Sequence, residues 1–211
     1  MTTPLPPAIR RADTADIARL SILLADAFLI SPVGDWLIPD LGERRTVYLR
    51  YFEIFVRHEL EHGVVDVTTD LTGVAIWHPR DESAPAPDNY DELLADATGP
   101  WADRFCALDK TFDEHHPGTF HHHLLFLGVV PSEQSRGIGS ALLRHHHARL
   151  DTEGIPAYLE ASMPRNRDLY LRHTYTAADP FYLPGDGPPL WPMWREPRSS
   201  EATTREQDSQ S

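Results

Sequence analysis

The chain has 211 residues, 41% of them hydrophobic and 24% charged, a composition typical of a globular protein with one large domain or two small ones. Its formal net charge of −13 argues against general nucleic-acid binding, which needs a basic face, and is compatible with a cationic substrate. No apolar run reaches the roughly 18 residues that span a bilayer, and Cys106 is the only cysteine. We therefore expect no membrane contact, no disulfide and a cytoplasmic location, with Cys106 buried as a small apolar side chain.

The N-terminal half predicts two helices and a hairpin after a flexible, proline-rich segment over residues 1–7. Residues 9–12 fit a short strand, and Asp13 or Thr14 fits the cap of a helix. The apolar stripe of that helix is Ile17, Leu20, Leu24 and Phe28. It is expected to end at 31–34, before a second helix over 43–61, hairpin strands over 64–69 and 74–78, and a loop over 79–90.

The C-terminal half is expected to contain both helices and strands. We expect helical structure over 91–116 with a break near 99–100, a strand over 121–130, a helix over 139–153 and a strand over 157–161. A short helix over 166–173 and strands over 175–181 and 190–195 complete a single domain that spans 8–196. The polar tail over 197–211 is predicted to be disordered.

The most informative segment is 124–140, LLFLGVVPSEQSRGIGS, in which an apolar strand runs into a glycine-punctuated loop and then a helix. Backbone N–H groups at a helix N-terminus, together with the helix dipole, favour a phosphate or pyrophosphate. Gly137 and Gly139 have no Cβ and allow such a group to approach the backbone closely. The spacing is neither G-x-G-x-x-G nor a Walker loop.

The loop matches Q/R-x-x-G-x-G/A, the acyl-CoA signature of the GNAT N-acetyltransferases, which the chain resembles from about Ile9 to Arg195. The phrases most similar to the branch containing puromycin N-acetyltransferase are LGVVPSEQSRGIGSALL, GIPAYLEASMPRNRDLYLRHTYT, PLWPMWR, ADAFLISPVGDWLIPD and GVAIWHP. The resemblance implies an α/β fold (α+β mixed sheet) with a V-shaped, splayed mixed sheet flanked by helices and acetyl-CoA in the splay. It also implies transfer of the acetyl group to a small-molecule amine, such as an antibiotic, by direct attack in a ternary complex.

The resemblance also implies which residues hold the cosubstrate. The strand that pairs with the pantetheine arm corresponds to Leu127, Gly128 and Val129. The pyrophosphate loop corresponds to Gln134, Arg136, Gly137, Ile138, Gly139 and Ser140. Asn166 and Tyr170 match the family's N-x-x-x-Y segment, where a tyrosine lies near the CoA sulfur. A phenol there can protonate the departing thiolate.

The general base is left open between three residues. His121 and His123 lie at the start of the strand that meets the cosubstrate, where family members often place a glutamate or histidine. In a regular strand these two histidines share a face with Leu125 and Leu127. Glu160 is a rival, with a supporting role beneath the site as its alternative.

The N-terminal half lines the acceptor pocket in this family, which makes Phe28, Asp35, Trp36 and Tyr51 substrate-binding candidates. Trp36 is favoured because it is predicted to lie in a loop. One departure from the family is Thr174, where relatives carry glycine. Because threonine resists a positive φ, we expect the turn after the tyrosine helix to be reshaped.

The histidine runs at 115–116 and 145–147 do not predict a metal site, because consecutive helical residues point in different directions. We expect acetyl-CoA as cosubstrate and no metal. Two other functions stay open: acetylation of a protein lysine or N-terminus, and a catalytically silent CoA-binding sensor. The chain is expected to be a monomer or a homodimer.

Overall fold

The computed structural model describes residues 7–80 and 87–198, so the expectations for residues 1–6, 81–86 and 199–211 lie outside the described residues. The described strands form one mixed sheet in the order β1-β2-β3-β4-β5-β8-β6, and β7 pairs with β8 at its edge. The strand bounds are β1 Ile9–Arg11, β2 Val64–Thr68, β3 Gly73–Arg80, β4 His121–Val129, β5 Ala157–Ala161, β6 Thr176–Ala177, β7 Phe181–Tyr182 and β8 Pro189–Arg195.

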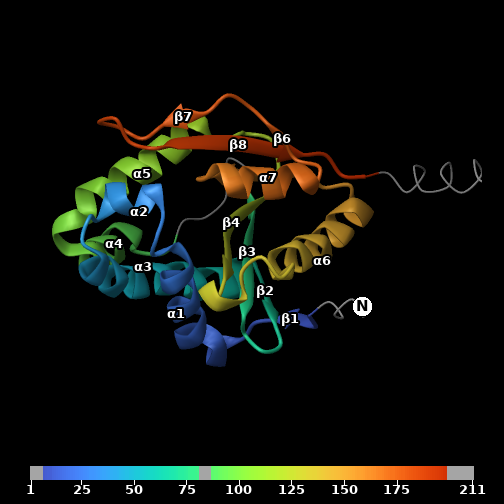
Figure 1. Cartoon of the computed structure of the whole chain (residues 1–211), viewed down its shortest axis with the longest axis horizontal. Helices are drawn as coiled ribbons and strands as arrows, with labels where there is room; N and C mark the ends of the chain where they lie inside the picture. The colour runs from blue at the N-terminus through green and yellow to red at the C-terminus, as the bar shows by residue number, and fades with distance from the viewer. Residues whose placement is uncertain (1–6, 81–86, 199–211) are drawn as a thin grey trace, which may run out of the picture.

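Helices cover both faces of the sheet and give the protein two apolar cores (Figure 1). One core contains residues of α1 (Ile17–Phe28), α2 (Pro32–Leu37), α3 (Leu41–His62), α4 (Tyr90–Thr98) and α5 (Ala102–His115). The other contains residues of α6 (Ile138–Glu153) and α7 (Pro164–Arg172). Short 3-10 turns occupy Thr14–Asp16, Gly99–Trp101 and Pro131–Glu133. Among the described helices, none is long and apolar enough to cross a membrane.

The central feature of the sheet is the separation of β4 from β5. These strands pair in parallel at only two positions, His122 with Ala157 and His123 with Tyr158. Beyond them β4 continues to Val129 and pairs with β3 alone, while β5 pairs with β8. The edge of β4 that faces β5 is therefore left without a strand partner over its second half, as the expected splay requires.

A β-bulge in β4 corrects one expectation. The register with β3 shifts between Ile76 and Trp77, so that the β4 partners jump from Phe126 to Leu124 and Leu125 is the extra residue. Leu125 and Phe126 consequently pack with the first core, whereas Leu127 packs with the second. The prediction that Leu127 shares a face with His121 and His123 was wrong, because the extra residue reverses the alternation.

The other element predictions hold to within a few residues, with three corrections. Residues 31–37 do not form only a loop: Ser31 caps α2 by accepting from the Gly34 amide, and Trp36 therefore lies in a helix. The expected strand over 175–181 is two short strands separated by irregular backbone. Cys106 is exposed, since it lies on the outer side of α5.

A buried arginine fixes α2 against α3. The Arg44 side chain is fully buried and donates to the carbonyl oxygens of Leu29 and Ile38 at 2.6 and 2.7 Å. Its second terminal nitrogen donates to Asp35 at 2.7 Å. Carbonyl groups at the ends of α1 and α2 are thereby satisfied, and the two helices are held beside the pocket described below.

Candidate active site

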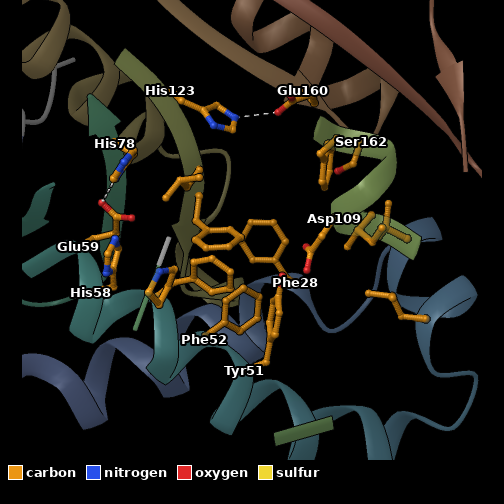
Figure 2. Close-up of a pocket in the computed structure, with 18 of the residues that line it drawn as sticks. Phe28, Tyr51, Phe52, His58, Glu59, His78, Asp109, His123, Glu160 and Ser162 are labelled. Atoms are coloured by element: carbon orange, nitrogen blue, oxygen red, sulfur yellow. Dashed lines mark hydrogen bonds and ion pairs between the residues drawn. The ribbon is translucent and has the colours of Figure 1, made fainter. Parts of the chain in front are cut away.

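A cavity of about 480 Å³ lies between the first core and the diverging ends of β4 and β5 (Figure 2). Its aromatic lining comes mainly from α1, α3, α4, α5 and β4: Phe28, Tyr48, Tyr51, Phe52, Phe55, Tyr90, Phe112 and Phe126. The Phe126 ring is central, with ring centroids 5.8 Å from Phe28, 5.1 Å from Phe52 and 5.4 Å from Phe55. A cavity of this size, lined by rings and a few polar groups, suits a small organic molecule.

A histidine–carboxylate pair lies where β4 and β5 separate. His123 Nε2 lies 2.8 Å from Glu160 Oε2, and both residues line the cavity together with Ser162. Burial opposes ionisation of Glu160, but His123 and His116 outweigh it and hold the pKa of the carboxyl well below its ordinary value. An ionised Glu160 can only accept, so Nε2 of His123 donates, and in a neutral imidazole the lone pair then lies on Nδ1. No described residue hydrogen-bonds to that Nδ1.

His121, the other histidine candidate, lies beneath this pair rather than in the cavity lining. It is fully buried, its Nδ1 donates to the Thr119 carbonyl oxygen at 2.6 Å, and its Nε2 lies 3.1 Å from His116 Nε2. Burial lowers the pKa of His121 to about 4, so the ring is neutral at pH 7. Both of its nitrogens are engaged, so of the two candidates only His123 has a ring nitrogen, Nδ1, without a described hydrogen-bond partner.

A second histidine–carboxylate pair lies on the neighbouring strand. His78 of β3 is directly opposite His123 in the sheet register, and its Nδ1 lies 2.8 Å from Glu59 Oε2 of α3. Gly63 leaves room for this carboxylate, because a Cβ there would lie 2.0 Å from Glu59 Oε2. Glu59, His78 and the adjacent His58 all line the cavity. Two imidazole–glutamate pairs thus stand side by side at one end of the aromatic pocket.

A third carboxylate, Asp109 of α5, lines the same cavity and accepts a hydrogen bond from the Tyr90 hydroxyl at 2.8 Å. Burial raises the pKa of Asp109 to about 6; the Tyr90 hydrogen bond opposes the shift, while Asp113 and Asp91 add to it. The cavity therefore combines apolar walls with carboxylates, an arrangement that favours a positively charged group on an organic body.

The glycine loop leads into the N-terminus of α6, as the sequence predicts. Gly137 caps the helix with φ of +85°, and Ile138, Gly139 and Ser140 form its first turn, whose N–H groups have no intrahelical acceptors. Gln134 donates to the Val129 carbonyl oxygen at 3.2 Å, and Arg136 to Glu133 at 2.6 Å. His173 Nε2 lies 2.9 Å from Ser140 Oγ. The loop can accept a diphosphate on its backbone.

The family's tyrosine position lies on α7, in the second core. Tyr170 is buried and packs edge-on against Tyr175 with ring centroids 5.8 Å apart, and it does not line the aromatic cavity. Burial raises the pKa of its phenol, so the group is protonated at neutral pH. Asn166 lies in the first turn of α7, whose N-cap is Met163. Thr174 adopts a positive φ of +66°, although a threonine side chain resists this left-handed conformation. The turn after α7 therefore keeps a left-handed residue, contrary to the expectation that threonine would reshape it.

Two substrate-binding candidates lie in the cavity lining and two do not. Phe28 and Tyr51 contribute rings to the lining. Asp35 is largely exposed and pairs with Arg44, while Trp36 donates from Nε1 to the Pro184 carbonyl oxygen at 3.0 Å. Neither Asp35 nor Trp36 is among the residues that line the cavity.

Some residues of the site were not predicted from the sequence. Glu59 and His78 were not singled out, although His58, Glu59 and His62 carry the spacing H-E-x-x-H in the printed sequence. Asp109 gave no sequence signal, because its position depends on how α5 packs. Arg165 at the start of α7 donates to Ser135 Oγ at 3.1 Å and so adds a cation beside the phosphate loop.

Replacing Asp109 with asparagine should change how stability depends on pH. The folded-state pKa of about 6 exceeds the ordinary 3.8, so the folded chain binds the proton more tightly and loses stability as pH rises through that interval. Asp109→Asn removes this loss. In thermal melts, the Tm of the variant minus the Tm of the wild type should be larger above about pH 6 than below about pH 4. Asp103→Asn, at an exposed position of the same helix, is the control, and equal pH profiles for Asp109→Asn and wild type would contradict the assignment.

Comparison with known proteins shows the family of the chain. The model of the Acetyltransferase (GNAT) family matches residues 33–175. An uncharacterized N-acetyltransferase of Schizosaccharomyces pombe is 26% identical over 214 residues, which cover 91% of this chain and 84% of the relative. A solved structure described as histone acetyltransferase HPA2 and related acetyltransferase from Corynebacterium glutamicum is 27% identical with a TM-score of 0.65, over 92% of this chain and 98% of that one.

Arylalkylamine N-acetyltransferase 2 from Aedes aegypti shares the fold at 11% identity, with a TM-score of 0.62 over 90% of this chain and 99% of its own. The matched family segment contains β4, the phosphate loop and α7, the elements on which the site is built. The chain belongs to the GNAT family and is an acetyltransferase.

Proposed function

We propose that the protein transfers an acetyl group from acetyl-CoA to the primary amine of a small molecule with an aromatic or apolar body, by direct attack in a ternary complex. The observation that carries the proposal is the His123–Glu160 pair, which borders an aromatic cavity at the point where β4 and β5 separate. The similarity of LGVVPSEQSRGIGSALL and its companion phrases to the puromycin N-acetyltransferase branch supports an antibiotic or another natural-product amine as acceptor.

Acetyl-CoA fits the groups available to hold it. The diphosphate would lie on the first-turn N–H groups of α6 and on Gly137, with Arg136 and Arg165 as the nearby cations. The pantetheine arm would lie along the open edge of β4 between Leu127 and Val129 and pair with the backbone groups that point to that edge. Bound there, the thioester supplies an activated acetyl group.

His123 is the proposed general base. An amine that enters as an ammonium must lose two protons on the way to the amide: one leaves the site and one ends on the CoA sulfur. Glu160 holds the His123 ring through Nε2–H, so that Nδ1 is the acceptor. In this arrangement Glu160 positions the His123 ring, and its negative charge attracts the incoming ammonium.

Tyr170 is the proposed acid for the departing thiolate. It lies on α7 in the second core, the side of the sheet on which the proposed diphosphate loop leads into α6, and away from the aromatic cavity. The raised pKa of the phenol keeps a proton available at neutral pH.

The aromatic cavity also bears on the substrate class. Its volume and enclosing rings suit a small molecule better than a peptide chain, and Glu59, Asp109 and Glu160 attract a cation. Lysine or N-terminal acetylation is the second candidate, favoured by the name of the C. glutamicum relative. A panel of aromatic primary amines and lysine peptides, assayed by thiol release, separates the two, and binding without turnover on any of them would favour the sensor.

The proposed role of the glycine loop in acetyl-CoA binding is tested by comparing substitutions at the two ends of α6. Gly137 and Gly154 cap the two ends of this helix, both with positive φ and with open space where a Cβ would lie. Valine imposes similar backbone strain at either position, but only Gly137→Val obstructs the phosphate loop. We expect calorimetry to show loss of acetyl-CoA binding in Gly137→Val and near-normal affinity in Gly154→Val. Equal affinities in the two variants would contradict the loop assignment.

The base assignment is tested by comparing His123→Gln with His121→Gln. We expect His123→Gln to lower kcat by about 100-fold or more at neutral pH without loss of acetyl-CoA binding. The deficit should shrink as pH rises, because the amine then deprotonates in solution. His121→Gln should lower the stability of the protein and have little effect on kcat. A larger and pH-dependent loss in His121→Gln would transfer the base role to that residue.

The acid assignment is tested by Tyr170→Phe, with Tyr175→Phe as the neighbouring control. Removing the Tyr170 hydroxyl should lower kcat about tenfold or more and leave acetyl-CoA affinity nearly unchanged. Tyr175→Phe should affect stability rather than kcat, because the Tyr175 hydroxyl lies 3.0 Å from His147 Nε2. An unchanged kcat in Tyr170→Phe would remove the acid role.

A further inference from the structure

We propose that His58, Glu59 and His78 form a binding site for a zinc-class divalent ion at the wall of the aromatic pocket. The three residues can each offer one ligand atom, and these atoms lie within 4.8 Å of one another. Two imidazoles and one carboxylate are ligands that Zn²⁺ accepts, and three protein ligands leave its fourth position open. In Figure 2 the three side chains gather on one side of the pocket.

The local sequence places these groups. His58 and Glu59 open the H-E-x-x-H segment of α3, and His62 lies one turn further on, with its ring centroid 4.6 Å from that of His58. The His58 and His78 ring centroids are 5.8 Å apart. Two imidazoles on one tetrahedral zinc, with Zn–N near 2.1 Å, have centroids about 5 Å apart. Small side-chain shifts therefore bring both nitrogens onto one ion.

The carboxylate is held in position before any ion arrives. Glu59 is almost fully buried and already contacts His78 Nδ1 at 2.8 Å. Gly63 provides the space for Glu59 Oε2, since any side chain there would collide with it. A buried carboxylate that is already positioned beside two imidazoles needs little rearrangement to act as a ligand.

A second group, His116, His123 and Glu160, also brings three ligand atoms within 4.8 Å. His116 does not line the cavity, whereas all members of the first group do. An ion that enters through the pocket therefore meets all three residues of the first group at its wall.

The site would influence turnover, a consequence that rests on the proposed acetyl transfer. His78 lies directly opposite His123 across β3 and β4. An ion there places positive charge beside the path of an incoming ammonium, so zinc should inhibit acetyl transfer reversibly, with recovery upon addition of a chelator.

The test is calorimetric titration of the chelator-treated, full-length protein with Zn²⁺, which needs no turnover and so stands or falls separately from the enzymatic proposal. We expect one saturable site in the wild type. His58→Ala and Glu59→Gln should each weaken binding about tenfold or more. Gly63→Ala should also weaken it without removing a ligand, because the added methyl would collide with Glu59 Oε2 and with the Trp77 carbonyl oxygen beside His78. Circular dichroism confirms that each variant is folded.

The controls are His145→Ala, an exposed histidine of α6, and His116→Ala from the second group. Both should bind zinc as the wild type does. Absence of saturable binding in the wild type would overturn the proposal. Unchanged affinity in His58→Ala and Glu59→Gln, or loss of binding in His116→Ala, would overturn it as well.

Discussion

The structure depends on one feature of the sheet: β4 and β5 stop pairing after two residue pairs. The two strands share register positions only at His122 and His123, and β4 then runs on with a single partner. Backbone N–H and C=O groups inside a protein need partners, so an unpaired edge in the middle of a sheet is a site for an extended ligand. The same separation lets Glu160 and Ser162 face Leu125 and Phe126 across the opening, and so connects the aromatic cavity with the edge of β4.

The bulge in β4 distributes side chains between the two sides of the sheet. Before it, His123 faces the aromatic core; after it, Leu127 and Val129 pack with α6 and α7. The aromatic cavity thus lies on one face and the glycine loop before α6 on the other, and the reacting groups are proposed to meet between them. Two imidazole–glutamate pairs on adjacent strands concentrate proton-accepting groups at this place, next to apolar walls that exclude water.

Much of this arrangement could be predicted from the sequence because it is local. Apolar runs, glycines and caps gave the hairpin, the phosphate loop and α6 within a few residues, and the break at Gly99 and Pro100 separates α4 from α5. The bulge at Leu125 was not predictable from alternation, since a regular pattern cannot reveal an extra residue. Asp109 and His78 enter the site through packing between distant segments, and Trp36 was misplaced because the Ser31 cap of α2 was not recognised.

The central claim is that the separation of β4 from β5, together with the start of α6, receives acetyl-CoA. Hydrogen–deuterium exchange of the full-length protein, with and without acetyl-CoA, tests it most directly, because amides that gain a partner exchange more slowly. The account predicts slower exchange in peptides that cover 125–129 and 137–140, with little change in α4 and α5. Protection elsewhere with none in these two segments would contradict it.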